Sequence, residues 1–225
     1  YLHYGWPIGR SVHSDIKSVH FNHRGAKNYP SHIDSYLRDG VERGQILGPL
    51  RSDPFDGSLI MSPLNTVPKK GCSDKRVILD LSLPKGHSVN DAIPCDSYLG
   101  EPCNLHFPRI DALVKLVKFY GKGCHLYKRD LRRAYRQIPV DPGDYECLGY
   151  KWKGHIFCDK VLAMGLRSAC QACQRVTNGV NYAFQMLGYK LVNYIDDFAG
   201  VARPESAQEA FECLGQLLFT LGLEE

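Results

Sequence analysis

The stretch that most constrains the fold of this chain is YKLVNYIDDFAGVA, residues 189–202. Apolar residues stand on both sides of two adjacent acids, Asp196 and Asp197. Two apolar half-strands around two acids predict a β-hairpin with both acids at its bend. Carboxylates flanked by core residues are unfavourable unless a cation lies against them, and hard divalent ions bind carboxylate oxygens. The alternative is an Asp-rich turn whose acids have only a local, structural role.

A second acidic position lies upstream in a similar strand context. Residues 124–130, CHLYKRD, predict a strand that ends at Asp130, and LRRAYRQIPV then predicts a short helical turn with an extended exit. In a split βαβ arrangement the ends of such strands lie side by side. Three carboxylates gathered there can hold two Mg²⁺ ions about 3.5–4 Å apart. Asp130 alone is weaker evidence, because an Asp after a strand is often the N-cap of a helix.

The remaining elements mix strands and helices without the rhythm of a parallel βαβ fold. One helix is expected to begin at Pro30, with Ser31 as its N-cap. Another is expected from Pro108 to Tyr120, with an apolar stripe of Ile110, Leu113, Val114 and Val117. Further expected elements are strands at 59–68 and 76–82, a hairpin of 146–152 and 155–161 about Lys153-Gly154, and helices at 166–187 and 205–222. This mixture predicts an α+β fold with an antiparallel sheet and helices packed on one face.

A basic, turn-forming link, KKGCSDK, joins the two strands at 59–68 and 76–82. The link contains three lysines and is followed by an arginine (Lys69, Lys70, Lys75 and Arg76). These cations either belong to a solvated loop or bind a triphosphate. The four His residues within 1–29 match no metal-ligand spacing, and this segment is expected to form an irregular surface arm.

Composition sets broad limits on function. The formal charge of +4 and the pI near 8.5 permit nucleic-acid binding without requiring it.

Nine scattered Cys residues do not form a disulfide scaffold, and Cys170 and Cys173 lack a second pair at zinc spacing, so free, mostly buried thiols are expected. No apolar run has membrane-spanning length, which makes an intracellular location, cytoplasm or nucleus, the default expectation. The chain begins with Tyr1 and is expected to be a piece of a longer protein.

Several successive motifs together resemble those of reverse transcriptases. YKRDLRRAYRQIPV, then LAMGLRSACQACQ, then YIDD are similar to the palm motifs of that family, and SPLNTVPKK, RVILDLS and SVNDAIP are similar to its fingers. The order and spacing agree over about residues 50–225. The residues of the upstream motifs resemble those of DIRS-like retrotransposons, which encode a tyrosine recombinase together with the polymerase.

The resemblance implies a right-hand polymerase that makes DNA from dNTPs on a primed RNA or DNA template with two Mg²⁺ ions, for which Mn²⁺ can substitute. By position, Asp130, Asp196 and Asp197 are the catalytic metal-binding acids, and Tyr135 lies under the incoming sugar and disfavours a 2′-hydroxyl. Lys69 and Arg76 match the fingertip cations on the triphosphate, and Gly165 matches a glycine near the incoming nucleotide. Arg167 and Tyr194 are the expected contacts to nucleic acid.

The resemblance also implies a division of the chain. After the arm at 1–29, the fingers span 30–105 and 138–168, and the palm spans 106–137 and 169–225. The sequence stops at LGLEE, before the expected lysine-bearing palm motif and thumb. A thumb, a ribonuclease H and a recombinase are therefore expected partners in the same polyprotein, and no membrane partner is expected. Ala163 and Cys170 stand where the family commonly has Pro, and Cys173 stands where an aromatic is common.

Two other functions fit part of this pattern. A catalytically inactive, polymerase-like domain would bind nucleic acid only, but such a domain is expected to have lost one of the three acids. A two-metal nuclease would have no use for the basic loop or Tyr135.

Overall fold

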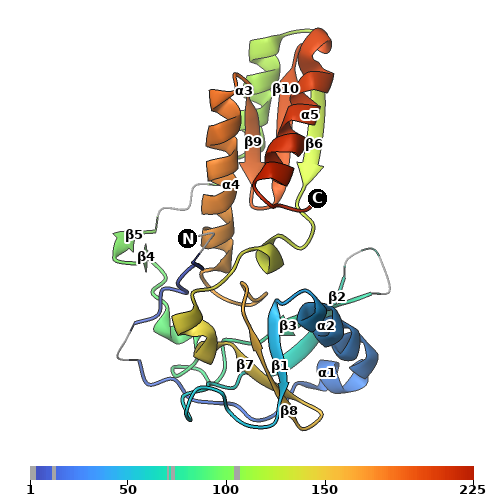
Figure 1. Cartoon of the computed structure of the whole chain (residues 1–225). Helices are drawn as coiled ribbons and strands as arrows, with labels where there is room; N and C mark the ends of the chain where they lie inside the picture. Colours follow the sequence, from blue (N-terminus) through green and yellow to red (C-terminus); the bar gives the residue numbers. More distant parts are fainter. Residues whose placement is uncertain (1–3, 12–13, 70, 72–73, 104–106) are drawn as a thin grey trace. The chain divides into compact units, whose positions relative to one another are not determined.

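The computed structural model describes residues 4–11, 14–69, 71, 74–103 and 107–225. The chain forms two compact units, each built from two separate stretches of sequence (Figure 1). Unit 1 comprises Tyr1–Asn104 and Ile138–Ala169, and unit 2 comprises Leu105–Gln137 and Cys170–Glu225.

Unit 2 contains an antiparallel sheet of three strands in the order β6-β10-β9. The strands are β6 (His125–Asp130), β9 (Leu191–Tyr194) and β10 (Asp197–Ala202). The helices are α3 (Ile110–Tyr120), α4 (Ala169–Met186) and α5 (Pro204–Thr220), with a short 3-10 turn η2 at Ala134–Gln137. The predicted hairpin is confirmed, since β9 and β10 pair. Its bend is at Ile195 and Asp196, however, and Asp197 is already the first residue of β10.

Two helices cover one face of this sheet. On β6, the Arg129 guanidinium lies 3.7 Å from the centre of the Phe211 ring of α5. Phe198 of β10 is paired with Arg129 on one side and with Asn193 of β9 on the other. Directly paired residues of antiparallel strands point to the same face. Because Asn193 donates hydrogen bonds to Thr177 and Asn178 of α4, helices α4 and α5 both lie on this face.

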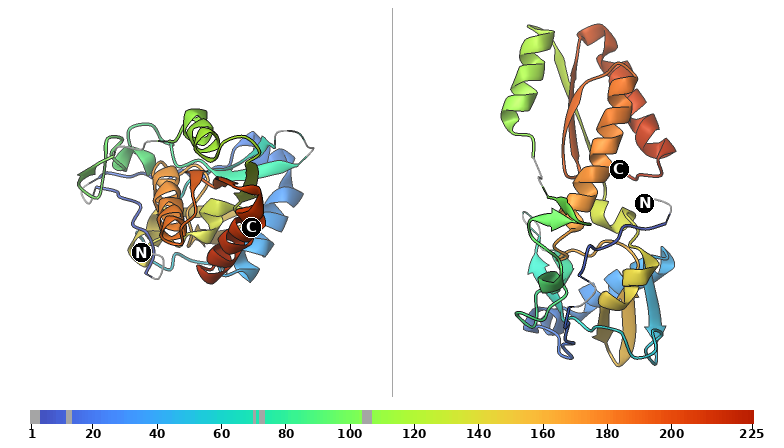
Figure 2. Two further views of the ribbon diagram at one scale, coloured as in Figure 1. Left: turned by 90° about the horizontal axis from the view of Figure 1, so that it is seen from above. Right: turned by 90° about the vertical axis from the view of Figure 1, so that its left-hand side faces the viewer.

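The third helix lies on the opposite face, which corrects the expectation that the helices pack on one face. Neighbouring strand residues alternate between faces, so Tyr194 points away from Asn193. The ring of Tyr194 packs against Phe107, just before α3, with ring centres 5.1 Å apart. Figure 2 shows the strands of unit 2 between α3 on one side and α5 on the other. A helical stripe predicts that a helix packs, but it does not say on which face of the sheet.

Helix α3 also begins later than expected. Arg109 is extended, with φ −89° and ψ 165°, so the helix starts at Ile110 rather than at Pro108. Two members of the predicted stripe are exposed, Ile110 at 70% and Val114 at 42%, while Leu113 and Val117 are half-buried. No α3 residue is fully buried, although this helix packs on β9 and β10.

Unit 1 contains the three-stranded sheet β1-β8-β7 and two hairpins, β2-β3 and β4-β5. Its strands are β1 (Ile46–Leu50), β2 (Leu64–Pro68), β3 (Lys75–Leu79), β4 (Ser97–Tyr98), β5 (Glu101–Pro102), β7 (Gly149–Trp152) and β8 (His155–Asp159). Its helical elements are α1 (Arg24–Asn28), α2 (Pro30–Glu42), η1 (Asn90–Ala92) and η3 (Pro142–Cys147). The predicted hairpin about Lys153-Gly154 is confirmed as β7-β8.

Local chemistry explains where unit 1 differs from the expected boundaries. Strand β2 begins at Leu64 rather than at residue 59, since Pro63 lacks the N–H that a paired strand residue donates. Strand β3 ends at Leu79, where the Asp80 carboxylate accepts a hydrogen bond from the Ser82 N–H and favours a turn. The N-cap of α2 is Tyr29, not Ser31, because Pro30 occupies the first turn.

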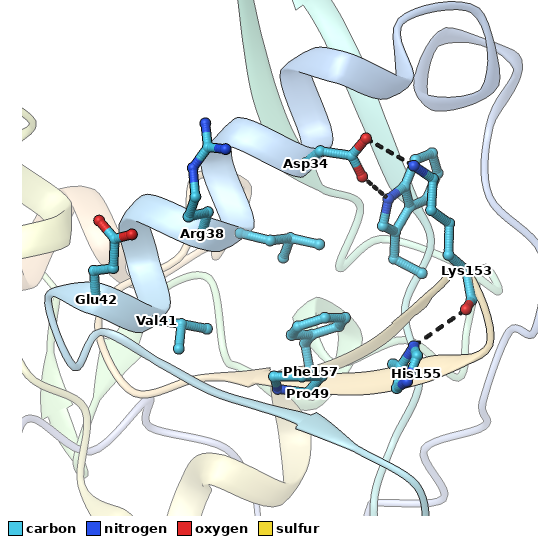
Figure 3. A pocket seen from close by; sticks show the side chains of 10 residues that line it. Asp34, Arg38, Val41, Glu42, Pro49, Lys153, His155 and Phe157 are labelled. Carbon is cyan, nitrogen blue, oxygen red and sulfur yellow. Dashed lines mark hydrogen bonds and ion pairs between the residues drawn. The ribbon is translucent and has the colours of Figure 1, made fainter.

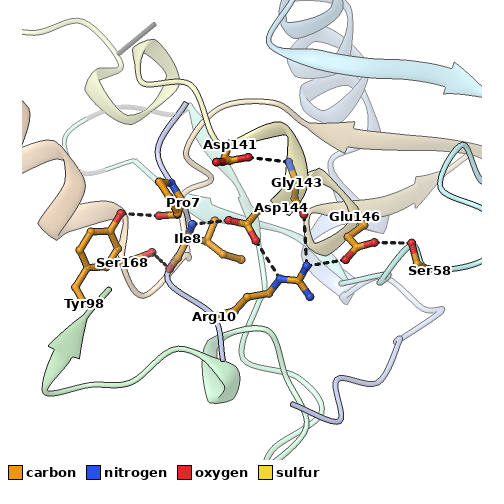
Figure 4. A network of polar contacts seen from close by, with 10 residues as sticks. All are labelled: Pro7, Ile8, Arg10, Ser58, Tyr98, Asp141, Gly143, Asp144, Glu146 and Ser168. Atoms are coloured by element: carbon orange, nitrogen blue, oxygen red, sulfur yellow. Dashed lines mark hydrogen bonds and ion pairs between the residues drawn. The ribbon is translucent and has the colours of Figure 1, made fainter. Parts of the chain in front are cut away.

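Residues 6–10 of the N-terminal segment are not a surface arm. Trp6 and Ile8 are buried, and the Ile8 N–H donates to the Asp144 carboxylate at 2.8 Å. The Ser168 hydroxyl donates to the Ile8 carbonyl at 2.8 Å, and Arg10 forms ion pairs with Asp144 and Glu146 (Figure 4). These partners are distant in sequence, so the local pattern of residues 1–29 gives no sign of them.

Two minor expectations can be compared with this fold. Among the described cysteines, all free thiols, Cys147, Cys158 and Cys173 are buried, whereas Cys95 is exposed and the others are intermediate. The expectation that most thiols are buried is therefore wrong for this part of the chain. None of the helices within the described ranges is long and apolar enough to span a bilayer.

Candidate active site

The three acids singled out in the sequence meet at one end of the sheet in unit 2. Asp130 ends β6 and is directly paired with Asp197, the first residue of β10. Asp196 lies in the bend, and its carbonyl accepts a hydrogen bond from the Leu131 N–H at 3.0 Å. One carboxylate oxygen from each residue lies within 4.8 Å of the others. The backbone pairing of β6 with β10 therefore brings three negative charges together.

Burial and the neighbouring carboxylates both act on the pKa of Asp130. Partial desolvation raises the pKa of Asp130 above the ordinary carboxyl value, and a side-chain hydrogen bond to Asp197 and the charges of Asp197 and Asp196 raise this pKa further. A cation already lies against the cluster, since Lys128 Nζ is 2.7 Å from Asp197 Oδ1. Three oxygen donors of this kind are the ligands that Mg²⁺ and Mn²⁺ prefer. The donor set and its need for positive charge fit a divalent metal.

Side chains of α4 hold the bend that carries Asp196. Ile195 has a φ of +53°, a strained conformation for a β-branched residue. The buried Gln174 side chain accepts a hydrogen bond from the Ile195 N–H at 2.8 Å and donates one to Asn178. Asn193, two residues before the bend, donates to Thr177 and Asn178. This amide network, buried at Gln174 and Asn193, holds the bend and keeps Asp196 and Asp197 beside Asp130.

The other predicted site residues of unit 2 lie near the acids in sequence or in space. Tyr135, in η2, is half-buried, and its hydroxyl lies near the thiol of Cys170. Burial raises the pKa of Tyr135 above the ordinary tyrosine value, with the charge of Cys170 as a further cause, so the hydroxyl remains protonated. Tyr194 is 47% exposed on the sheet face that also carries Asp130 and Asp197.

Gly165 and Arg167 belong to a tightly held loop of unit 1. Gly165 has a φ of +118°, and a Cβ atom there would collide with the carbonyl of Leu79. Asn90 holds both sides of the loop, since its amide donates to the Gly165 carbonyl at 2.8 Å and accepts from the Arg167 N–H at 2.7 Å. The Arg167 guanidinium donates to the Ile93 carbonyl at 2.7 Å. Glycine is therefore required at position 165 for structural reasons.

Lys69 and Arg76 lie at the end of the β2-β3 hairpin in unit 1. Arg76 is exposed on β3, where it pairs with Val67, and Lys69 follows β2 and is also exposed. Lys75, beside Arg76, lies over the ring of Tyr29, with Nζ 4.7 Å from the ring centre. The expectation for Lys70 concerns a position outside the described residues.

Sequence reasoning missed two residues that the structure places at the acid cluster, Lys128 and Gln174. Lys128 precedes Asp130 by two positions, and strand periodicity alone places both on one face. Gln174, Asn178 and Asn181 recur at helical spacing within an otherwise largely apolar segment. A polar stripe of this kind on a helix that also carries apolar core residues is the signal that could have found the network.

A separate cavity of about 460 Å³ in unit 1 lies between α2 and the β7-β8 hairpin (Figure 3). Its floor is apolar, with Leu37, Trp152 and Phe157. Asp34 on its rim accepts hydrogen bonds from the Trp152 indole N–H and from Lys153. None of the predicted site residues lines this cavity.

Comparisons with known proteins relate this arrangement to a known fold. No protein-family model and no curated protein matches the sequence. The chain is similar to the foamy viral protease-reverse transcriptase dRH solved with double-stranded DNA, at 17% identity and a TM-score of 0.74, with 98% of this chain and 34% of that chain covered. It is also similar to a prototype foamy virus protease-reverse transcriptase CSH mutant, at 18% identity and a TM-score of 0.74, with 98% and 26% covered.

A third similar structure is the foamy viral protease-reverse transcriptase solved with an RNA/DNA hybrid, at 17% identity and a TM-score of 0.71, with 95% of this chain and 25% of that chain covered. The chain thus spans about a quarter to a third of the length of these proteins. At a sequence identity this low, the similarity shows the fold but does not show the activity. On that ground, the fold of this chain is reverse transcriptase-like.

Proposed function

We propose that this chain is the fingers and palm part of an RNA-directed DNA polymerase, a reverse transcriptase, from a retrotransposon of DIRS-like type. The observation that carries the proposal is the intact set of three acids, gathered by strand pairing at one end of the sheet in unit 2. The reverse transcriptase-like fold supports it. We assign the fingers to unit 1 and the palm to unit 2, an assignment that the division of the chain into these units supports.

In this proposal Asp130, Asp196 and Asp197 hold two Mg²⁺ ions, which Mn²⁺ can replace. Ions held by these acids would supply Lewis-acid activation of the primer 3′-hydroxyl and charge stabilisation for the departing pyrophosphate. The Tyr135 ring lies under the incoming sugar and disfavours a 2′-hydroxyl. Lys69 and Arg76 bind the triphosphate, and the side-chain-free Gly165 permits close approach of the nucleotide. Arg167 and Tyr194 contact the primer and template.

The proposed partners are dNTPs and a primed RNA or DNA template. Two of the similar proteins were solved with double-stranded DNA and with an RNA/DNA hybrid, which supports a nucleic-acid partner for this fold. We further propose that a thumb, a ribonuclease H and a recombinase belong to the same polyprotein. An intracellular site of action, in cytoplasm or nucleus, follows from this role.

Primer extension tests the proposal directly. A protein that continues past Glu225 into the proposed thumb is expected to extend a DNA primer on an RNA template with dNTPs, and chelation of Mg²⁺ is expected to stop the reaction. Template binding without any incorporation, at Mg²⁺ and Mn²⁺ concentrations across the usual range, would instead support an inactive nucleic-acid-binding domain.

The role of the basic hairpin can be tested with Arg76→Ala. A guanidinium offers a planar fork to phosphate oxygens, so the variant is expected to raise the KM for dNTPs much more than it weakens binding of primer–template. Both quantities, and the salt dependence of template affinity, should be measured on the same variant.

The alternatives for Arg76 give different results. A solvated loop predicts no change in either quantity. A contact to the template backbone predicts weaker template binding with a salt slope that is shallower by about one phosphate. Loss confined to template affinity would contradict the placement of Arg76 at the triphosphate.

A further inference from the structure

The acid cluster has a positively charged neighbour within its own sheet. Lys128 and Asp130 are two positions apart on β6, so their side chains project from the same face. Lys128 is paired with Ala199, and Asp197 lies diagonally across from it on β10. The small side chain of Ala199 leaves room for the lysine to reach along the sheet. Lys128 Nζ consequently lies 2.7 Å from Asp197 Oδ1.

The adjacent arginine cannot serve the acids in the same way. Arg129 projects from the opposite face, where it donates a hydrogen bond to the Phe211 carbonyl and forms an ion pair with Glu225. Its side chain is 15% exposed, whereas that of Lys128 is 62% exposed. Lys128 is therefore the basic residue that β6 presents to the acids, and its exposed position leaves it free to move.

The Lys128–Asp197 pair suits a temporary partner rather than a permanent one. Ion pairs between exposed side chains are weak, and the Asp197 side chain is itself 43% exposed. Asp197, whose carboxylate Lys128 contacts, is one of the three acids whose carboxylate oxygens lie within 4.8 Å of one another. A divalent ion at that position competes with a single ammonium charge for the same carboxylate.

We propose that Lys128 is a built-in counter-ion that holds the Asp197 carboxylate in the metal-free protein and is displaced when a divalent cation binds. The proposal rests on the proposed function, because it takes the acid cluster as a metal site. Lys128 neutralises part of the cluster's repulsion while the site is empty. The cost is a weaker apparent metal affinity, since the ion must displace the ammonium group and then bind near its positive charge.

Binding of Mn²⁺ to the 225-residue chain tests the proposal without any need for activity. The free ion is measured by electron paramagnetic resonance for the wild type and for Lys128→Met, which keeps a long side chain without its charge. One positive charge about 6 Å from a divalent ion, under water-like screening, changes affinity by about tenfold. Lys128→Met is therefore expected to bind Mn²⁺ about tenfold more tightly.

Two matched variants isolate the cause. Lys128→Arg keeps the charge and is expected to stay within about twofold of the wild type. Lys122→Met removes an exposed lysine from the turn before β6, at the end of the strand remote from Asp130, and is also expected to match the wild type. A variant that merely damages the fold would lose Mn²⁺ affinity, so tighter binding is a result that structural disruption cannot produce.

Unchanged or weaker Mn²⁺ binding by Lys128→Met would overturn the counter-ion role while leaving the metal site, and the proposed function, in place. If neither the wild type nor Lys128→Met binds Mn²⁺, the metal site itself fails, and the counter-ion proposal fails with it. Binding by Lys128→Met alone would be the strongest form of the expected result.

Discussion

Asp130→Asn is expected to abolish dNTP incorporation in a thumb-complete protein while leaving the fold intact. Asp130 is directly paired with Asp197, and its carboxylate is one of the three that gather at the end of the sheet. A metal ion contributes several kcal/mol to stabilising the charge of a phosphoryl-transfer transition state, which corresponds to a loss of about a thousandfold or more in rate. Primer extension under single-turnover conditions measures the loss.

The fold should survive because asparagine has the same shape and removes one of three crowded negative charges. Thermal unfolding and circular dichroism should therefore match the wild type or show a slight gain. Asp111→Asn is a suitable control, since Asp111 is an exposed acid in the first turn of α3 and belongs to the same unit. Incorporation by Asp130→Asn near the wild-type level would refute the assignment of the acids.

Tyr135→Ala is expected to admit ribonucleotides. If the ring lies under the incoming sugar, it excludes a 2′-hydroxyl by steric conflict, and its removal opens that space. The ratio of kcat/KM for an rNTP to that for the matching dNTP is expected to rise by about tenfold to a hundredfold, the usual scale of discrimination by shape in a pocket. Single-nucleotide incorporation with each substrate gives this ratio.

Tyr135→Phe is the matched control for the ring. It keeps the steric bulk and removes only the hydroxyl near Cys170, so the ratio should remain near that of the wild type. A rise with Tyr135→Phe would show that the hydroxyl positions the ring. An unchanged ratio in Tyr135→Ala would place the sugar gate at another residue.

The predictions from sequence succeeded where the relevant forces are local. The alternation of apolar residues around Asp196 and Asp197 predicted the hairpin, and the strand ending at Asp130 was clear from its own residues. Their meeting at one sheet edge followed from a supersecondary arrangement rather than from spacing. The residues expected at the nucleotide and template, Lys69, Arg76 and Tyr135 among them, rest on family resemblance and stay predictions.

The failures concern contacts between residues that are distant in sequence. The burial of Trp6 and Ile8 depends on partners near Asp144 and Ser168, which no local pattern reveals. The packing of helices on both faces of the sheet depends on which face α3 covers. The apolar stripe of α3 does not predict that face. The strand period alone places Lys128 on the same face as Asp130, but its ion pair with Asp197 joins two strands that are distant in sequence.

The central position of β10 also sets when the acid cluster can form during synthesis. Within the described residues, β6 pairs with β10 alone, and β10 lies far downstream in the sequence. A ribosome adds about 5–20 residues per second, so β6 leaves the tunnel several seconds before its partner exists. Until then β6 has unpaired N–H and C=O groups, a state that favours aberrant association with other chains. The nascent polypeptide therefore cannot assemble the acid cluster until translation has passed β10, and β6 is the segment that a chaperone would most usefully shield in the interval.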